Sequence, residues 1–389
     1  MLPRYLHDAL ARDLGHKVLL VTGPRQCGKT TLSRMLADDH QYLSHDLAEH
    51  RLLLADKAWD RRAGLVIFDE LHKMDGWKAW LKGIVDVEGM PPALVVTGSA
   101  RSSAFRKVGD SLAGRHFEFR LHPFDLKELA AQAERPAGEI FERLMLVGGF
   151  PEPYLDGTAR FHARWRRSHV DLILKEDLVT LTAVRDVQSI ETLIELLRSR
   201  VGSSVSAASL ARDLGKSAHT VRHWLGLLED LYVVFKVVPW HRNVARALLK
   251  EPKYYFFDNA MVIGDDGARL ENLVACALHK DIERAVDVDG DEIALHYVRD
   301  KEGREVDFVL VRGGRPCALV EVKWSEAERA PALRRFFADE APRRLQVVGT
   351  LGRARSFPDG DRVEPAAGFL AKLDVAALCA GRADPSGPG

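Results

Sequence analysis

The sequence predicts an α/β protein of several domains, and three apolar runs indicate the first of them. Residues 17–22, 64–70 and 93–99 are short and mostly apolar, and helical patterns separate them. Continuous apolar runs of this kind are typical of strands buried on both faces of a parallel sheet. Each run ends at glycine or polar residues, so we expect ligand-binding groups at the carboxyl edge of that sheet.

The composition narrows the class of protein. The chain has 389 residues, with 56 Lys and Arg against 56 Asp and Glu. This balance gives no support for nucleic-acid or membrane binding, which would have to depend on local patches. The N-terminus carries no apolar signal segment, and no run reaches about 18 apolar residues. We therefore expect a cytoplasmic protein with no membrane partner.

The cysteines form no recognisable pattern. They are far apart and include no C-x-x-C pair: Cys27, Cys276, Cys317 and Cys379. This spacing argues against a zinc site or a disulfide framework, and it fits a reducing compartment.

Residues 23–30 match the phosphate-loop pattern G-x-x-x-x-G-K-(S/T) without a mismatch. The loop follows a predicted strand and precedes a helical stretch, so backbone N–H groups converge on the phosphates. Lys29 can reach the β- and γ-phosphates, and the Thr30 hydroxyl can ligate Mg²⁺. The pattern predicts ATP and Mg²⁺ as ligands and the following nucleotide contacts: Gly23, Pro24, Arg25, Gln26, Cys27, Gly28, Lys29, Thr30 and Thr31.

Two later strands carry the remaining groups of a hydrolytic site. The run 64–70 ends in Asp69 and Glu70, typical of a Walker B strand. Asp69 would hold Mg²⁺ and Glu70 would act as a general base on water. The alternative is that both acids only end a strand at the surface. Thr97 and Ser99, at the end of the run 93–99, are candidate sensors of the γ-phosphate.

The segment 113–119 follows a helix-like stretch at 102–112 and contains Arg115. Here the sequence resembles the AAA+ ATPases, in which an arginine at this place contacts the γ-phosphate held by a neighbouring subunit. The resemblance implies that Arg115 is catalytic and that the chain forms a homo-oligomer, in the manner of a ring. The alternative for Arg115 is an ion pair within the chain.

The middle of the chain predicts two helical units. Residues 131–188 are expected to form a small helical lid. Its arginines between 160 and 167 are more typical of a solvated helix face than of a contact to nucleotide or nucleic acid. Residues 189–257 have helix-turn-helix spacing, with Gly215 ending one helix and Ser217 capping the next, followed by two strands. This predicts a winged helix that serves either as a DNA reader or as a protein–protein spacer. Its candidate DNA contacts are Lys216, His219, Arg222, His223, Arg242 and Arg246.

Residues 258–380 contain the order D…E-x-K, formed by Asp307, Glu321 and Lys323 on two predicted strands. Two carboxylates beside an ammonium can hold a divalent cation and a scissile phosphate. The region resembles the restriction-endonuclease-like, or PD-(D/E)xK, fold, with Glu271 at the place of its helical glutamate. The alternative is a fold that keeps the acids only as a structural network. Residues 381–389 are expected to be disordered.

The order of modules extends the resemblance. The chain carries Gly-Pro-Arg-Gln-Cys-Gly-Lys-Thr-Thr, Phe-Asp-Glu, Thr-Gly-Ser, Leu-Ala-Gly-Arg, Gly-Gly-Phe-Pro-Glu, Phe-Phe-Asp-Asn, Glu-Val-Asp-Phe and Glu-Val-Lys. It resembles the prokaryotic ATP-binding proteins that have a C-terminal domain of unknown function. This implies an AAA+-like P-loop ATPase core at 1–130, a helical lid, a winged-helix domain and a restriction-endonuclease-like α/β C-terminal domain. The lid has no clear second sensor arginine.

Two functions follow from this organisation. The first is an ATP-driven protein that acts on branched or duplex DNA, by branch migration, unwinding or cleavage. The second is a nucleotide-dependent switch that binds protein partners and carries an inactive nuclease-like domain.

Overall fold

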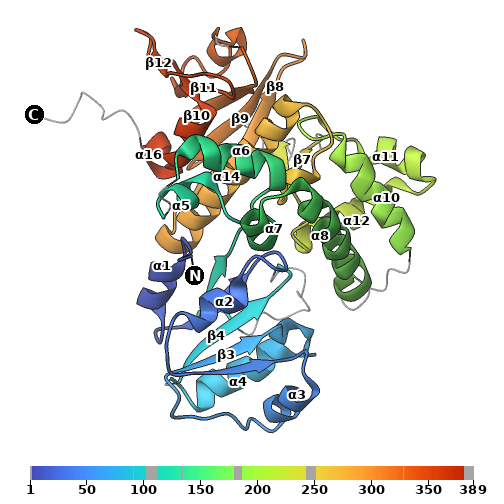
Figure 1. Ribbon diagram of the computed structural model, residues 1–389, viewed down its shortest axis with the longest axis vertical. Coiled ribbons are helices and arrows are strands. Elements are labelled where there is room, and N and C mark those ends of the chain that lie inside the picture. The colour runs from blue at the N-terminus through green and yellow to red at the C-terminus, as the bar shows by residue number, and fades with distance from the viewer. Residues whose placement is uncertain are drawn as a thin grey trace, which may run out of the picture.

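The structure is a computed structural model, and it describes residues 2–90, 92–101, 112–132, 135–178, 186–241, 251–326 and 328–380. Figure 1 shows two sheets, one at each end of the long axis, with helices between and beside them. Most of the predicted helix at 102–112, Arg242, Arg246 and the tail at 381–389 fall outside the described residues.

The N-terminal sheet is wholly parallel, with the strand order β2-β3-β4-β1-β5. Alternate residues of β1 reach opposite faces: Val18 and Leu20 join one buried cluster, whereas Leu19 and Val21 join another. Both faces are therefore buried, as the continuous apolar runs predict. The strands are β1 (Val18–Thr22), β2 (His40–Ser44), β3 (Leu65–Asp69), β4 (Ala93–Gly98) and β5 (His116–Arg120).

Helices cover this sheet on both sides. Trp77, Leu81 and Ile84 of α4 pack on one face, and Leu6, Ala9 and Leu10 at α1 pack on the other. The helices are α1 (His7–Asp13), α2 (Lys29–Arg34), α3 (Ala48–Ala55) and α4 (Trp77–Val87), with the short η1 (Leu71–Lys73) after β3.

A run of helices follows the first sheet. Side chains at their N-caps hold several of them: Thr158 accepts a hydrogen bond from Phe161 N, and Ser217 from Thr220 N. Gly215 ends its helix with a φ of 64°, so the predicted stop and cap are confirmed. The helices are α5 (Leu126–Ala130), α6 (Ala137–Val147), α7 (Pro151–Asp156), α8 (Ala159–Leu172), the π-helical η3 (Ile173–Leu178), α10 (Val187–Arg198), α11 (Ala207–Leu214) and α12 (Ala218–Asp230).

The second sheet is mixed and has the strand order β12-β13-β11-β10-β9-β8-β6-β7. The strands β8, β9 and β10 are antiparallel, whereas β10, β11 and β13 are parallel. Its strands are β6 (Val234–Pro239), β7 (Lys253–Phe256), β8 (Ile293–Arg299), β9 (Glu305–Arg312), β10 (Arg315–Lys323), β11 (Arg343–Val348), β12 (Arg355–Ser356) and β13 (Arg362–Pro365).

One long helix, α14 (Asp266–Asp289), packs against this sheet, and Figure 1 shows it extending toward the first sheet. The remaining short elements are η4 (Asn259–Met261), η5 (Pro331–Arg334), α15 (Ala366–Ala371) and α16 (Val375–Cys379).

The β6–β7 hairpin, which the sequence predicts as the wing of a winged helix, is joined to the second sheet. Strands β6 and β7 pair antiparallel with each other, but Val238 and Pro239 of β6 also pair with His296 and Tyr297 of β8. The hairpin is therefore the edge of the C-terminal sheet. A single buried apolar cluster extends from the lid helices to α16, so the core crosses the boundary predicted at residue 257.

The expectation of no disulfide is wrong. Cys317 of β10 is bonded to Cys379 of α16, with the two Cα atoms 4.9 Å apart. Because 62 residues separate the two cysteines along the chain, only the packing of α16 on the sheet brings them together. Cys27 and Cys276 are free thiols. No helix within the described residues is long and apolar enough to cross a membrane.

Candidate functional site

The phosphate loop lies between β1 and α2, at the carboxyl edge of the first sheet. Gly23 has a φ of 150°, and a Cβ there would lie 2.2 Å from the carbonyl oxygen of Leu121. Gly28 has a φ of 99°. Both positions require glycine for backbone reasons, because side chains would clash or be strained.

Lys29 turns back into the loop that precedes it. Its Nζ donates to the carbonyl oxygens of Gly23 at 2.9 Å and Pro24 at 2.7 Å, and the side chain is buried. The ammonium is thus held at the mouth of the loop, close to where phosphates bind in loops of this pattern.

Asp69 receives hydroxyl donors from three elements. Thr30 Oγ1 lies 3.3 Å from both carboxylate oxygens, and Thr97 donates to Oδ1. Tyr42 of β2 also donates to Asp69, at 2.5 Å. Burial and the hydrogen bond to the Asp69 carboxylate raise the pKa of Tyr42 to about 12. The structure therefore brings Thr30, Asp69 and Thr97 together, and adds Tyr42 to them.

Glu70 follows β3 in the left-handed region, with a φ of 52°. Its Oε2 accepts a hydrogen bond from Ser99 Oγ at 3.0 Å and lies 3.4 Å from His72 Nε2. Burial is the main cause that lowers the pKa of His72 to about 3, and the nearby Lys73 and Lys29 add to it. His72 is consequently a neutral imidazole beside Glu70.

The lid contacts the phosphate loop directly. The guanidinium of Arg25 donates to both oxygens of Asp177 in η3, at 2.7 Å each, and lies 3.3 Å from Glu176. Gln26 Oε1 lies 2.9 Å from His169 Nδ1 of α8. A cavity of about 470 Å³ lies here, lined by Arg25, Gln26, Gly28, Lys29, Thr30, Thr31, Glu70, Pro151, Glu152 and Leu172.

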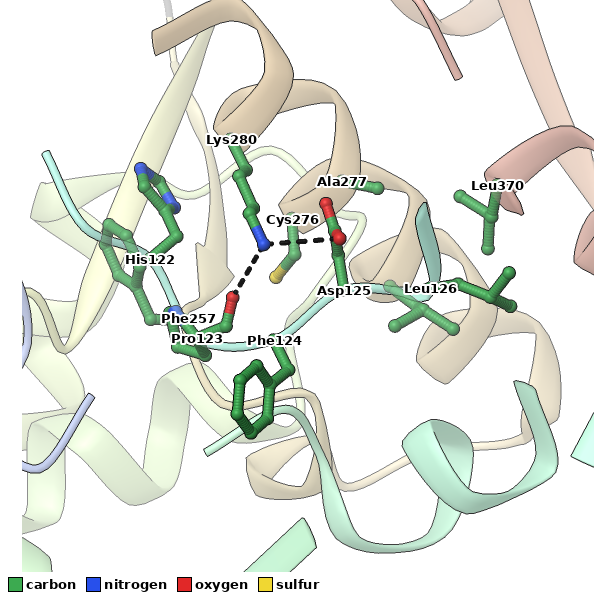
Figure 2. Close-up of a pocket in the computed structure, with 11 residues that line it drawn as sticks. His122, Pro123, Phe124, Asp125, Leu126, Phe257, Cys276, Ala277, Lys280 and Leu370 are labelled. Atoms are coloured by element: carbon green, nitrogen blue, oxygen red, sulfur yellow. Dashed lines mark hydrogen bonds and ion pairs between the residues drawn. The ribbon is translucent and has the colours of Figure 1, made fainter. Parts of the chain in front are cut away.

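A buried ionic cluster ties the loop to the C-terminal part. Arg4 donates to the carbonyl oxygen of Cys27 at 2.5 Å and to Glu128 at 2.7 Å. Glu128 also accepts from Lys280 of α14 at 2.6 Å. Figure 2 shows Lys280 reaching the carbonyl of Pro123, and the carboxylate of Asp125 at 3.2 Å, beside a small pocket. The backbone of the phosphate loop at Cys27 is thus connected through Arg4 and Glu128 to Lys280 of α14.

Arg115 lies away from the phosphate loop. Its side chain forms a partly exposed ion pair with Asp86 at the end of α4, with distances of 2.6 and 3.2 Å. Since β5 is parallel to β1 and begins at His116, Arg115 lies at the opposite edge of the sheet from the phosphate loop. Within this chain, Arg115 therefore forms an intramolecular ion pair, which is the alternative to a contact with nucleotide.

The helix-turn-helix residues differ in their partners. Lys216 forms an ion pair with Asp186 at 2.7 Å, whereas His219, Arg222 and His223 are exposed on α12. His219, Arg222 and His223 are spaced to share one face of α12, whereas Lys216 lies before that helix and is engaged within the chain.

The acids of the C-terminal region do come together, but around an unpredicted lysine. Asp307 of β9 accepts a hydrogen bond from Val322 N of β10 at 2.8 Å, and Lys323 lies 3.0 Å from Glu321. Lys253 of β7 lies 3.2 Å from Glu271 and 3.6 Å from Asp307. No sequence pattern marks Lys253, because strand pairing places it there.

The described residues contain one group of three side chains with metal-binding spacing: His122, His279 and Glu283. Arg120 lies 2.5 Å from Glu283, and a guanidinium at this distance opposes a dication. The group is better described as part of the ionic contact between the first sheet and α14.

Comparisons with known proteins agree with the geometry. Residues 15–130 match a family model described as an AAA domain, which supports a P-loop ATPase domain in this part of the chain. Residues 138–264 and 266–365 match two family models described as domains of unknown function.

Three similar proteins are described as uncharacterized proteins. Two are from Mycobacterium bovis and Mycobacterium tuberculosis, each 29% identical over 350 residues, which is 85% of this chain and 76% of theirs. The third, from Haemophilus influenzae, is 24% identical over 260 residues, 62% of each chain.

Two solved structures show a weak likeness. A variant of Thermotoga maritima RuvB is 18% identical with a TM-score of 0.32, over 59% of this chain and 86% of that one. A DNA replication initiation factor is 16% identical with a TM-score of 0.30, over 58% and 86%. Scores this low carry no inference about this chain.

Proposed function

We propose that the chain is a magnesium-dependent ATPase. The observation that carries the proposal is the convergence of Lys29, Thr30, Asp69 and Glu70 at one edge of a parallel sheet, where a cavity opens beside the loop. The match of residues 15–130 to an AAA domain supports it.

Each group has a role that follows from its contacts. Lys29 and the backbone N–H groups of the loop bind the phosphates. The Thr30 hydroxyl and the Asp69 carboxylate are oxygen ligands that suit Mg²⁺, and their mutual distance of 3.3 Å lets them face one ion. Bound Mg²⁺ neutralises charge on the phosphates.

Glu70 is the proposed general base. Ser99 and His72 contact the same oxygen, Oε2, and thereby orient the carboxylate toward the cavity that Glu70 lines. Glu70 takes the proton of a water molecule as that water attacks the γ-phosphate. Thr97 holds Asp69 in place, and both predicted sensors are thus connected to an acid of the site.

We propose that ATP hydrolysis drives an action on branched or duplex DNA. The support is the helix–turn–helix arrangement of α11 and α12, with His219, Arg222 and His223 exposed on the second helix. The proposal includes the winged-helix interpretation of residues 189–257, a cytoplasmic location, and assembly into a homo-oligomer in which Arg115 contacts the nucleotide of a neighbour. DNA cleavage is left out, because Lys253 lies among the acids that would bind metal.

The contacts of α14 favour a second candidate, a nucleotide-dependent switch that binds protein partners. Lys280 and Glu283 of this helix form ionic contacts with the segment around β5 and α5, so movement at the phosphate loop has a direct path to the second sheet. Such a switch would need no contact with DNA.

A salt-dependent DNA titration distinguishes the two. If α12 contacts DNA phosphates, the association constant falls steeply with salt, and Arg222→Ala makes the slope shallower by about one. Hydrolysis should also rise when branched or duplex DNA is added. The control variant for both measurements is Glu191→Gln, at an exposed position of α10. No binding at low salt, with no effect of DNA on hydrolysis, favours the switch.

A further inference from the structure

Lys253 lies at the centre of the acid cluster in the second sheet. Its Nζ is 2.5 Å from Glu305, 3.2 Å from Glu271 and 3.6 Å from Asp307, and its side chain is fully buried. The three carboxylates come from β9 and α14, whereas the lysine comes from β7, at the edge of the sheet.

The charge of Lys253 is fixed by these neighbours. Burial lowers the pKa of the ammonium, but the carboxylates of Glu271, Asp307 and Glu305 more than offset it, so that the pKa is raised. Burial also raises the pKa of Asp307, and the nearby Glu271 and Glu321 add to it. The Lys253 ammonium therefore supplies positive charge among these carboxylates that a metal ion would otherwise supply.

Several of the oxygen atoms that would bind a metal are already engaged. Glu271 Oε1 accepts from Lys253 and from Tyr255, the latter at 2.7 Å, and its Oε2 faces Gly202, where a Cβ would lie at 2.5 Å. Asp307 Oδ2 accepts from Val322 N. Glu321 Oε2 is buried without a hydrogen-bond partner among the described residues. The carboxylates of this cluster do not bring three ligand atoms within 4.8 Å of one another, since the one such group among the described residues is His122, His279 and Glu283. The residues therefore do not fit a divalent cation.

We propose that Lys253 is the resident cation of this cluster and takes the place that a divalent metal would hold. The cluster then anchors the first turns of α14 to β7 and β9 through ion pairs, and it is not a metal-dependent cleavage site. This inference is independent of the ATPase proposal, because none of these residues belongs to the phosphate-loop site.

Metal binding by the folded protein tests the proposal directly. Mn²⁺ is titrated calorimetrically into nucleotide-free protein carrying Asp69→Asn, so that the phosphate-loop site does not contribute, and into the same protein with Asp307→Asn added. We expect Mn²⁺ binding to be the same with and without Asp307→Asn. Saturable binding that disappears with Asp307→Asn overturns the proposal, whereas binding that is equal in both proteins arises elsewhere and agrees with it.

Removing the lysine gives the converse test. In the same Asp69→Asn protein, Lys253→Ala opens space among the carboxylates, and we expect Mn²⁺ affinity to increase at least tenfold. Lys323→Ala is the matched control, since that ammonium is partly exposed and contacts Glu321. Equal Mn²⁺ affinity in both variants contradicts the role of Lys253. If Lys253→Ala does not fold, the Asp307→Asn comparison decides.

Discussion

Arg25 of the phosphate loop and Asp177 of the lid form a bidentate ion pair, with both N–O distances at 2.7 Å. Asp177 is buried, and that burial raises the pKa of its carboxyl even though Arg25 opposes the shift. A guanidinium binds phosphate with the same geometry as it binds carboxylate. We therefore expect the phosphates of a bound nucleotide to compete with the lid for Arg25.

Asp177→Asn should tighten nucleotide binding. The amide keeps the shape of the side chain but releases the charge of Arg25 toward the phosphates, and we expect the dissociation constant of ATP to fall on the order of tenfold. The control is Glu176→Gln, because Glu176 is exposed and lies 3.3 Å from Arg25. Titration with a fluorescent nucleotide measures both. Weaker ATP binding in the Asp177→Asn protein would show that the pair supports the site instead of competing with it.

Arg115 and Asp86 can be separated by mutation. If Arg115 acts only through its exposed ion pair, Arg115→Ala and Asp86→Asn should each change the free energy of unfolding little and leave hydrolysis unchanged. If Arg115 contacts a neighbouring subunit's nucleotide, Arg115→Ala alone should lower turnover, and mixing it with Lys29→Ala subunits should restore part of it. We expect Arg115→Ala to lower turnover and the mixture with Lys29→Ala subunits to recover part of it. Full turnover by a protein that sediments as a monomer at all concentrations contradicts it.

His279 should make the protein less stable in mild acid. Burial lowers the pKa of His279 to about 3, and its neighbours are Glu283, His122, Arg101 and Arg120. Below about pH 6.5 the unfolded chain binds a proton at this histidine that the folded chain excludes, so the free energy of unfolding falls by up to about 1.4 kcal/mol per pH unit. The contribution is fully present above pH 6.5.

His279→Phe should remove that part of the slope. The ring is stacked on Phe235 at 4.3 Å, so phenylalanine preserves the packing. Urea unfolding at pH 5.0, 6.0 and 7.5 measures the slope. His223→Asn, on the exposed face of α12, is the control and should leave the slope as in the parent. Because Asp287, whose pKa burial raises to about 6, acts in the opposite direction, the comparison is between variants. Equal slopes in His279→Phe and the parent would contradict the prediction.

Local patterns predict the first sheet and its loop well. Continuous apolar runs indicate β1, β3 and β4, and the spacing of Gly23, Gly28 and Lys29 indicates the loop, because the backbone itself imposes these residues. The cap at Ser217 is equally local and is confirmed.

Other features depend on register and packing, which one sequence does not carry. Tyr42 reaches Asp69 because β2 pairs with β3, and Asp177 reaches Arg25 from 152 residues away. Lys253 enters the acid cluster only because β7 lies on the edge of the same sheet. The pairing of Cys317 with Cys379 likewise follows from α16 packing on β10.

The most direct test of the account compares ATP hydrolysis and ATP binding in the parent, Glu70→Gln and Lys29→Ala proteins, with Mg²⁺ present. The parent should hydrolyse ATP, and Glu70→Gln should bind ATP with similar affinity while turnover falls about 10²–10⁴-fold, because the amide cannot accept a proton. Lys29→Ala should lose hydrolysis and much of its affinity, since the ammonium held at the loop is gone. Turnover in Glu70→Gln at the parental rate would contradict the assignment of the general base. The absence of hydrolysis in the parent, with or without DNA, would contradict the proposed function itself.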